Sequence, residues 1–233
     1  MESQIEKSLS ILAIDTSGKA CSMAFWEQDE VKSSFFEIMN RGHSEILIPT
    51  IQKIIIKAKR DYKDIDWLAI NLGPGSFTGV RIGLAAVKGL SIAADKPIYG
   101  IDSFNAWLAP LKVGLYSLKT SVSDKIFWVV LNNGIGQLYI QSFDQKFNSL
   151  LAPILIRPEE FTTYLISSQF FVIIGDGIPL IKPFIKKDNI FFVDDYHYPN
   201  ASHWVTFIAA QLKTQVPSIG ISPIYLRQKY KDV

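Results

Sequence analysis

A strand that ends in a glycine loop and continues as a long helix most constrains the fold of this chain. The apolar run from Trp67 to Leu72 stops at Gly-Pro-Gly, and residues 76–94 then have the pattern of a helix. Free backbone N–H groups at such a helix start often hold phosphates. Glycines also permit close packing, so the sequence GPGSFTG leaves two alternatives, an anion site or a packing device.

The loop matches none of the standard glycine motifs. A P-loop needs Lys-Ser or Lys-Thr after its last glycine, and no spacing among Gly73, Gly75 and Gly79 supplies that pair. A dinucleotide fingerprint counted from Gly73 would put Thr78 in the place of the third glycine. The G-x-S-x-G motif of a nucleophile elbow is also absent. An unusual anion site and a packing device therefore remain.

Composition sets wide bounds on function. The chain has 233 residues, of which 48% are hydrophobic and 12% aromatic, so it can bury a sizeable core. A net charge of +2 argues neither for nor against nucleic acid as a partner. The single cysteine, Cys21, excludes an internal disulfide and is typical of a reducing compartment. Apolar runs are too short for a membrane helix and the first ten residues too polar for a signal peptide, so we expect a cytoplasmic protein.

The apolar and turn patterns predict a similar order of elements twice. In the first half we expect strands at 9–14, 21–26 and 31–38, a helix at 44–59, a strand at 67–71, a helix at 76–94 and a strand at 98–101. In the second half we expect strands at 126–131, 137–143 and near 154, a helix from 157–160, a strand at 171–174, a helix opened by GDGIPL, a strand at 190–193 and a helix at 201–213.

This order predicts an α/β fold of two similar β-β-β-α-β-α halves with mixed central sheets. The halves are expected at residues 1–105 and 106–233, and the polar stretch 117–125 is the expected join. Whether the last segment packs back on the N-terminal half stays open.

Halves of this kind resemble the actin-like ATPase (ASKHA, ribonuclease H-like) architecture, in which nucleotide lies in the cleft between them. Four blocks narrow the resemblance: ILAIDTSGKACSMAF, RGHSEILIPTI, GPGSFTGVRIGLAAVKGL and SPIYLR. Together they are similar to the TsaB (YeaZ) family of bacterial accessory proteins for the threonylcarbamoyl (t6A) modification of tRNA adenosine 37. The first three blocks cover most of residues 11–90, and the fourth lies near the end of the chain.

The resemblance implies a non-catalytic scaffold rather than an enzyme. Such a chain would bind and activate a TsaD-like catalytic subunit, recruit a TsaE-like ATPase and meet tRNA only through the complex. It would form a homodimer when alone and need no cofactor, with ATP or ADP only at a shared interface of the complex. The alternatives are an active actin-like ATP-dependent enzyme and a metallopeptidase-like (glycoprotease) protein.

The residues that would carry catalysis are missing or replaced. The catalytic relative carries H-x-x-x-H, whereas Leu47 stands four residues after His43, so we expect no metal site. Asp15 in DTSGK has the form of a phosphate-approaching turn, but the second half reads VVLNNGIG and offers the neutral Asn132 where an acidic residue would hold Mg²⁺. The candidates for a residual phosphate contact are Asp15, Thr16, Ser17, Gly75 and Ser76.

The sequence also gives expectations for one serine and the cysteine, and leaves one aspartate without an assigned role. Ser76 is expected to cap the following helix, and Cys21 to be an inert thiol in the core. The role of Asp176 in GDGIPL stays open, like that of Asn132.

Small residues recur along the predicted helix at 76–94. A stripe through Gly79, Gly83 and Ala86 would let another element approach closely, although each helical glycine costs about 1 kcal/mol relative to alanine. The pattern alone fits burial in the chain's own core and contact with a partner equally well. The resemblance favours a partner, because TsaB uses its first two long helices to bind the corresponding helices of TsaD. The predicted interface is Leu47, Ile51, Ile54, Gly79, Arg81, Gly83, Ala86 and Val87.

Overall fold

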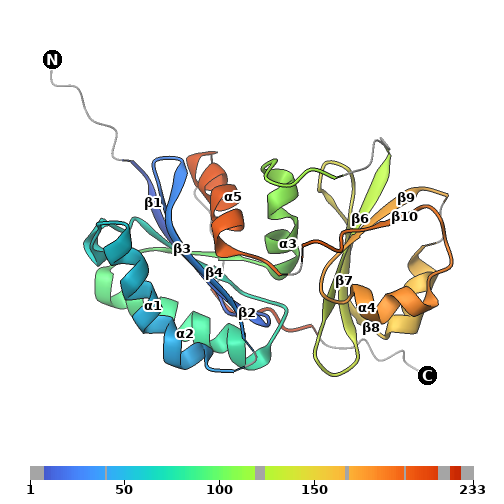
Figure 1. Ribbon diagram of the computed structural model, residues 1–233, viewed down its shortest axis with the longest axis horizontal. Helices are drawn as coiled ribbons and strands as arrows, with labels where there is room; N and C mark the ends of the chain where they lie inside the picture. The colour runs from blue at the N-terminus through green and yellow to red at the C-terminus, as the bar shows by residue number, and fades with distance from the viewer. Residues whose placement is uncertain are drawn as a thin grey trace, which may run out of the picture.

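Two five-stranded mixed sheets with the same strand order form the two halves of the molecule (Figure 1). The computed structural model describes residues 8–39, 41–118, 124–165, 168–196, 198–214 and 221–226. The predicted join at 117–125 therefore lies partly outside the described residues. The N-terminal sheet has the order β3-β2-β1-β4-β5, and the C-terminal sheet has the matching order β8-β7-β6-β9-β10.

The strands lie close to their predicted positions. The N-terminal strands are β1 (Ser10–Asp15), β2 (Ala20–Glu27), β3 (Glu30–Ile38), β4 (Trp67–Asn71) and β5 (Ile98–Ile101). The C-terminal strands are β6 (Lys125–Asn132), β7 (Leu138–Phe143), β8 (Ser149–Ile156), β9 (Phe170–Ile174) and β10 (Ile190–Phe192). In both halves the first strand pairs antiparallel with the second and parallel with the fourth. The predicted α/β fold of two actin-like halves is confirmed.

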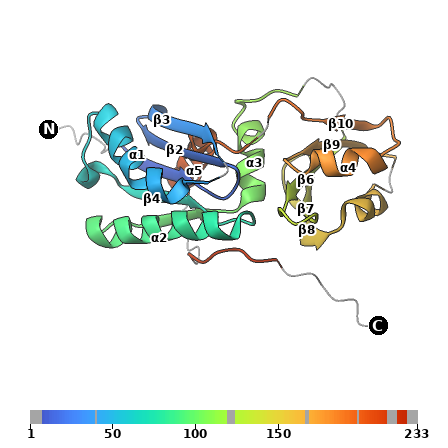
Figure 2. The same cartoon turned by 60° about the horizontal axis from the view of Figure 1, so that its bottom comes forward.

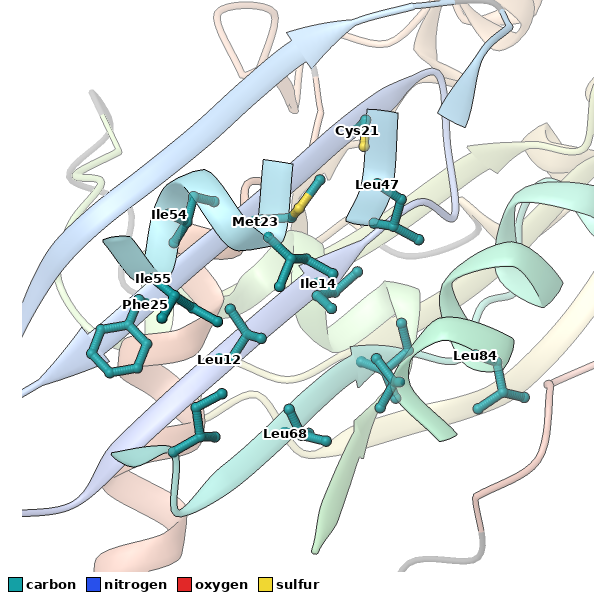
Figure 3. Packing of buried hydrophobic residues seen from close by; sticks show 14 of the residues in the cluster. Leu12, Ile14, Cys21, Met23, Phe25, Leu47, Ile54, Ile55, Leu68 and Leu84 are labelled. Carbon is teal, nitrogen blue, oxygen red and sulfur yellow. The ribbon is translucent and has the colours of Figure 1, made fainter. Parts of the chain in front are cut away.

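Both faces of the N-terminal sheet are covered by helices. Helices α1 (His43–Lys57) and α2 (Phe77–Ala94) pack on one face, and α3 (Ser103–Lys112) and α5 (Ala201–Thr214) lie on the other (Figures 1 and 2). Successive strand residues point to opposite faces, so Leu12 meets the α1–α2 side while Ile11 meets α5. Figure 3 shows the first of these cores, in which Leu47 and Ile54 of α1 lie over Leu12, Ile14 and other strand residues. Because helices cover both faces of this sheet, its central strands have nearly continuous apolar sequences.

Helix α3 links the two halves and was not predicted from the sequence. Its Ala106 and Ala109 pack with α5 and the N-terminal sheet, whereas Phe104 and Leu108 pack on the C-terminal sheet. The helix crosses the predicted boundary between residues 105 and 106, and α5 returns to the N-terminal half. The two halves are therefore not separate stretches of the chain.

Short helices cover the outer face of the C-terminal sheet. They are η2 (Pro158–Tyr164), α4 (Ile178–Ile181) and η3 (Lys182–Phe184), and a further 3-10 turn, η1 (Tyr62–Asp64), precedes β4 in the other half. Trp128 of β6 packs edge-on against Phe161 of η2, with ring centroids 5.3 Å apart. The helix expected from residue 157 is thus a 3-10 helix.

Helix α2 is long and apolar enough to cross a membrane by length and composition alone, with a mean hydropathy of 1.3 over 18 residues. The inner side of this helix packs on the N-terminal sheet through residues such as Leu84 and Val87, which are 5% and 0% exposed. The apolar character of α2 thus has a structural explanation on its inner side.

Candidate functional site

A cleft of about 680 Å³ lies between the two halves. Lys19, Arg41 and His43 line it from the N-terminal half, near the first residues of α1 and α2. Asn132, Asp176 and Tyr198 line it from the opposite side. The volume falls within the range of small-molecule sites, so the cleft is large enough for a ligand. One wall is basic, and the other offers a carboxyl, amides and a phenol.

Asp15 lies beneath the cleft rather than in it. The residue is 3% exposed, and its Oδ1 accepts hydrogen bonds from the Ser17 backbone N–H at 2.9 Å and the Ser17 hydroxyl at 2.7 Å. Its Oδ2 accepts from Asn71 Nδ2 at 2.9 Å, and the Asn71 oxygen accepts in turn from the Gly73 N–H and the Ser103 hydroxyl. Burial raises the pKa of Asp15, and the hydrogen bonds from Asn71 and Ser17 counteract this. Asp15 therefore ties the first turn to the glycine loop.

The glycine loop is held against the same turn by its backbone. The Ser76 N–H donates to the Ser17 carbonyl at 2.7 Å, and a Cβ added at Gly75 would lie 2.2 Å from that carbonyl oxygen. Only glycine permits this approach. The Ser76 hydroxyl accepts from the Gly79 N–H at 3.1 Å, which confirms Ser76 as the N-cap of α2.

The five predicted phosphate contacts divide into two groups. The prediction is wrong for Asp15 and Thr16, because both are buried and engaged inside the protein, Thr16 by donating to the Gly79 carbonyl at 2.7 Å. Ser17, Gly75 and Ser76 line the cleft, so a phosphate contact at these three stays a prediction.

The small-residue stripe of α2 faces the chain's own sheet, not a partner. A Cβ at Gly79 would lie 2.0 Å from the Thr16 carbonyl oxygen, and one at Gly83 would lie 2.5 Å from Thr16 Oγ1 and 2.9 Å from Ile70 Cδ1. The glycines are needed because α2 packs directly on β1 and β4. The prediction that these two glycines contact a partner is therefore wrong.

Four of the predicted apolar contacts are also inside the core. They are Leu47, Ile51, Ile54 and Val87, each at most 3% exposed. Their helical spacing correctly marks an apolar face, but that face covers the N-terminal sheet (Figure 3). Arg81 is exposed and Ala86 partly exposed, so partner contact at these two stays a prediction.

One carboxyl group at the cleft and one thiol in the core have pKa values that burial raises. Asp176 accepts a hydrogen bond from the Asn132 N–H at 2.9 Å, and burial raises the pKa of Asp176 against this bond and the charge of Lys19 across the cleft. Burial, with the charge of Asp15, raises the pKa of the Cys21 thiol to about 12, and the predicted core position of Cys21 is confirmed.

Nothing in the described ranges gathers three or more His, Cys, Asp or Glu side chains around a common point. His43 is the first residue of α1, and its Nε2 is buried with no hydrogen-bond partner among the described residues. Leu47 stands where the second histidine of a metal pair would be, and its side chain is buried in the core.

Comparison with known proteins identifies the family. Residues 35–118 match the family model described as TsaD, tRNA N6-adenosine threonylcarbamoyltransferase. Over 208 residues the chain is 30% identical to the tRNA threonylcarbamoyladenosine biosynthesis protein TsaB of Buchnera aphidicola subsp. Schizaphis graminum, covering 86% of this chain and 93% of that protein. The chain belongs to the TsaB family.

Two further TsaB comparisons extend over nearly the whole chain. The TsaB of Haemophilus influenzae is 27% identical over 230 residues, which cover 96% of this chain and 95% of the relative. The solved structure described as YeaZ from Pseudomonas aeruginosa superposes with a TM-score of 0.76 at 20% identity and covers 94% of this chain and all of that one. The second likeness shows that the fold is shared. The resemblance read from the four sequence blocks is confirmed.

In this TsaB-family chain, the outer side of α1 and α2 carries unusual apolar exposure. Ile48 and Ile56 of α1 are 49% and 64% exposed, and Phe77 and Ile92 of α2 are 56% and 84% exposed. These four residues are called the outer helix face below. The interface predicted from the sequence did not include these four residues, because it followed the small-residue stripe of α2 and the apolar stripe of α1. Their off-stripe positions in an otherwise amphipathic pattern were the available signal.

Proposed function

We propose that this chain is a non-catalytic scaffold for the t6A modification of tRNA adenosine 37. It binds and activates a TsaD-like catalytic subunit, recruits a TsaE-like ATPase and meets tRNA through the complex, in the cytoplasm. Membership of the TsaB family supports this role, because relatives that align over most of the chain are named for tRNA threonylcarbamoyladenosine biosynthesis.

The engagement of Asp15 is the observation that carries the non-catalytic part of the proposal. An actin-like ATPase needs carboxylates free to hold Mg²⁺ or its waters at the nucleotide phosphates. Both Asp15 oxygens are taken up by Ser17 and Asn71 below the cleft, and the corresponding strand end of the other half carries Asn132. An ATP-dependent enzyme and a metallopeptidase therefore have less support, the latter because Leu47 replaces the second histidine.

The outer helix face supports the partner. The segment that matches the TsaD family model, residues 35–118, contains both α1 and α2, so a TsaD-like chain is expected to carry the same helix pair. Similar faces can pair around an approximate two-fold axis, and a single chain can cover the same face by pairing with its own copy. A homodimer of the isolated chain, displaced by the TsaD-like subunit, follows from this arrangement.

Enzyme assays and co-purification test the proposal. The purified chain is expected to show neither ATP hydrolysis nor tRNA modification alone, and to co-purify with the TsaD-like protein of its own cell. Adding it to TsaD-like and TsaE-like chains is expected to start modification. Sustained turnover by the chain alone that is lost in an Asp176→Asn variant would overturn the scaffold role.

Self-association is tested by sedimentation. Ile56→Glu places a charge on the outer helix face, so it is expected to shift the isolated chain from dimer to monomer and weaken binding to the TsaD-like chain. Phe184→Ala, an exposed apolar position in the C-terminal half at 47% exposure, is the matched control and should change neither. A wild-type chain that is monomeric at all workable concentrations would contradict the homodimer.

A further inference from the structure

The segment 221–226 returns from the end of the chain to the start of α2. Figure 2 shows it running beside this helix, in red at the end of the colour scale. The Ile224 N–H donates to the Leu72 carbonyl at 2.9 Å, and the Ile221 and Ile224 side chains pack against the core beneath α2. These contacts fix the backbone of the segment on the glycine loop, independently of the side chain of Tyr225.

Tyr225 completes a surface cluster of two tilted aromatic rings and one guanidinium. Phe77 and Arg81 are one turn apart on α2, and the Arg81 Cζ lies 3.6 Å from the Phe77 ring centroid. The Tyr225 ring lies 5.6 Å from the Phe77 ring, and the Tyr225 hydroxyl accepts a hydrogen bond from Arg81 Nε at 2.9 Å. The guanidinium of Arg81 is therefore held by Phe77 of its own helix and by Tyr225, which lies 144 positions from Arg81 in the sequence.

This arrangement is unusual for a surface with no partner. Phe77 and Tyr225 are 56% and 50% exposed, and Arg81 itself is exposed. In the part of the chain that the structure describes, the only hydrogen bond of the Arg81 side chain is through Nε, and it forms no ion pair. The two terminal nitrogens keep the geometry that binds a carboxylate through two hydrogen bonds. Tyrosine and arginine, held rigid, are also the residues that most often dominate binding energy at interfaces.

We propose that Tyr225 is a positioning residue that holds Arg81 as the charged centre of the surface for the TsaD-like subunit, and that this partner supplies a carboxylate to Arg81. The inference rests on the proposed function. In this proposal Tyr225, from the segment 221–226, joins the outer helix face in forming the surface for the partner. The occupant follows from charge: Arg81 forms no ion pair with the residues that the structure describes, and an oriented guanidinium beside apolar residues fits a partner helix face that carries an Asp or Glu.

Binding of the TsaD-like chain from the same organism, measured by interferometry, tests the inference. Arg81→Ala is expected to weaken binding about 30-fold, as for a residue that dominates an interface, and Arg81→Lys about 10-fold because the planar fork is lost. Arg81→Glu should weaken binding more than Arg81→Ala, since two carboxylates would then face each other. Equal losses for Arg81→Ala and Arg81→Glu would overturn the partner carboxylate.

The positioning role of Tyr225 is tested by a double-mutant cycle. Tyr225→Phe keeps the ring and removes the hydroxyl that holds Arg81, so it is expected to weaken binding several-fold while the melting temperature stays unchanged. In the Arg81→Ala background, Tyr225→Phe should have no further effect, because its partner is gone. Additive losses would show that Tyr225 does not act through Arg81 and would overturn this part.

The outcomes separate this inference from the proposed function. If the wild-type chain does not bind the TsaD-like chain, the proposed function itself fails. If the wild type binds and Ile56→Glu weakens binding, but the Arg81 and Tyr225 variants bind like the Phe184→Ala control, only the inference fails.

Discussion

Three glycines of α2 lie in different surroundings, although they look alike in the sequence. Gly79 and Gly83 touch the first turn and β4, where a methyl group would meet Thr16 or Ile70 at less than 3 Å. Gly89 has nothing within 4 Å of its added Cβ and is exposed. The first two glycines are therefore required by packing, whereas the third carries only the conformational cost of glycine in a helix.

The same substitution should thus have opposite effects at two positions of one helix. Gly79→Ala is expected to lower the free energy of unfolding by about 2 kcal/mol, because the backbone of the first turn must move to make room. Gly89→Ala is expected to raise it by up to about 1 kcal/mol through better helix propensity. Urea denaturation of both variants measures the difference. Equal changes at the two positions would contradict the packing of α2 on the first turn.

A larger side chain at Gly83 tests the direction in which the stripe points. Gly83→Arg would put a long charged side chain between α2 and β4, so the variant is expected not to fold. Circular dichroism would show the loss of a cooperative melt. A variant that melts normally and loses only partner binding would instead restore the partner-facing assignment.

At the scale of elements, the strands and long helices could be predicted because their apolar patterns are strong. Helix α3 was missed although Asp102 caps it and apolar side chains follow at Phe104, Trp107, Leu108 and Leu111, the spacing of a helix face. Pro110 lies inside this segment, where a proline usually argues against a helix.

The candidate site was predictable only in part. Periodicity shows that α1 and α2 have an apolar face, but it cannot show whether a sheet or another protein covers it. That choice depends on contacts such as Gly83 with Thr16, which are distant in the sequence. The hydrogen bonds of Asp15 with Asn71 and of Arg81 with Tyr225 are equally non-local, so neither could be foreseen.

Helix α5 gives a pH dependence that can be measured. His203 is half-buried beside Tyr196, with ring centroids 6.1 Å apart, and burial lowers the pKa of His203 from its ordinary value near 6.5. The unfolded chain therefore binds the proton more tightly, so the stability linked to neutral His203 is fully present above about pH 6.5 and is lost as the pH falls below it.

His203→Phe should reduce this acid sensitivity. The variant keeps a ring against Tyr196 and cannot be protonated, so its melting temperature should fall less than that of the wild type between pH 7.5 and 5. Thermal melts at several pH values compare the two proteins. Parallel curves would show that His203 is not the titrating group.

At the scale of the whole molecule, the N-terminal half depends on α5, a helix that follows the C-terminal strands in the sequence. Trp204 and Ile208 of this helix are fully buried against one face of the N-terminal sheet, and the Ala201 N–H donates to the Ser22 hydroxyl at 3.0 Å. Lys213 at the other end of α5 forms an ion pair with Asp29. Without α5, an apolar sheet face is left bare.

A chain that ends after residue 196 is therefore expected not to form a native N-terminal half. It should bind a hydrophobic dye and melt without cooperativity, as a state that has lost fixed packing does. Co-expression with a fragment covering residues 197–233 should restore a cooperative melt. A truncated chain that melts like the full one would show that α5 is dispensable.

This dependence on α5 also has a consequence for synthesis on the ribosome. Ser22 and its partner Ala201 are 179 residues apart, and translation at roughly 5–20 residues per second needs about 10 to 40 s to cover that distance. In the later part of this interval, after β5 (Ile98–Ile101) has been made, all strands of the first sheet exist, but the helix that shields one face of the sheet does not yet exist. We expect nascent chains of this protein to be clients of chaperones that bind exposed apolar strands until α5 has been made.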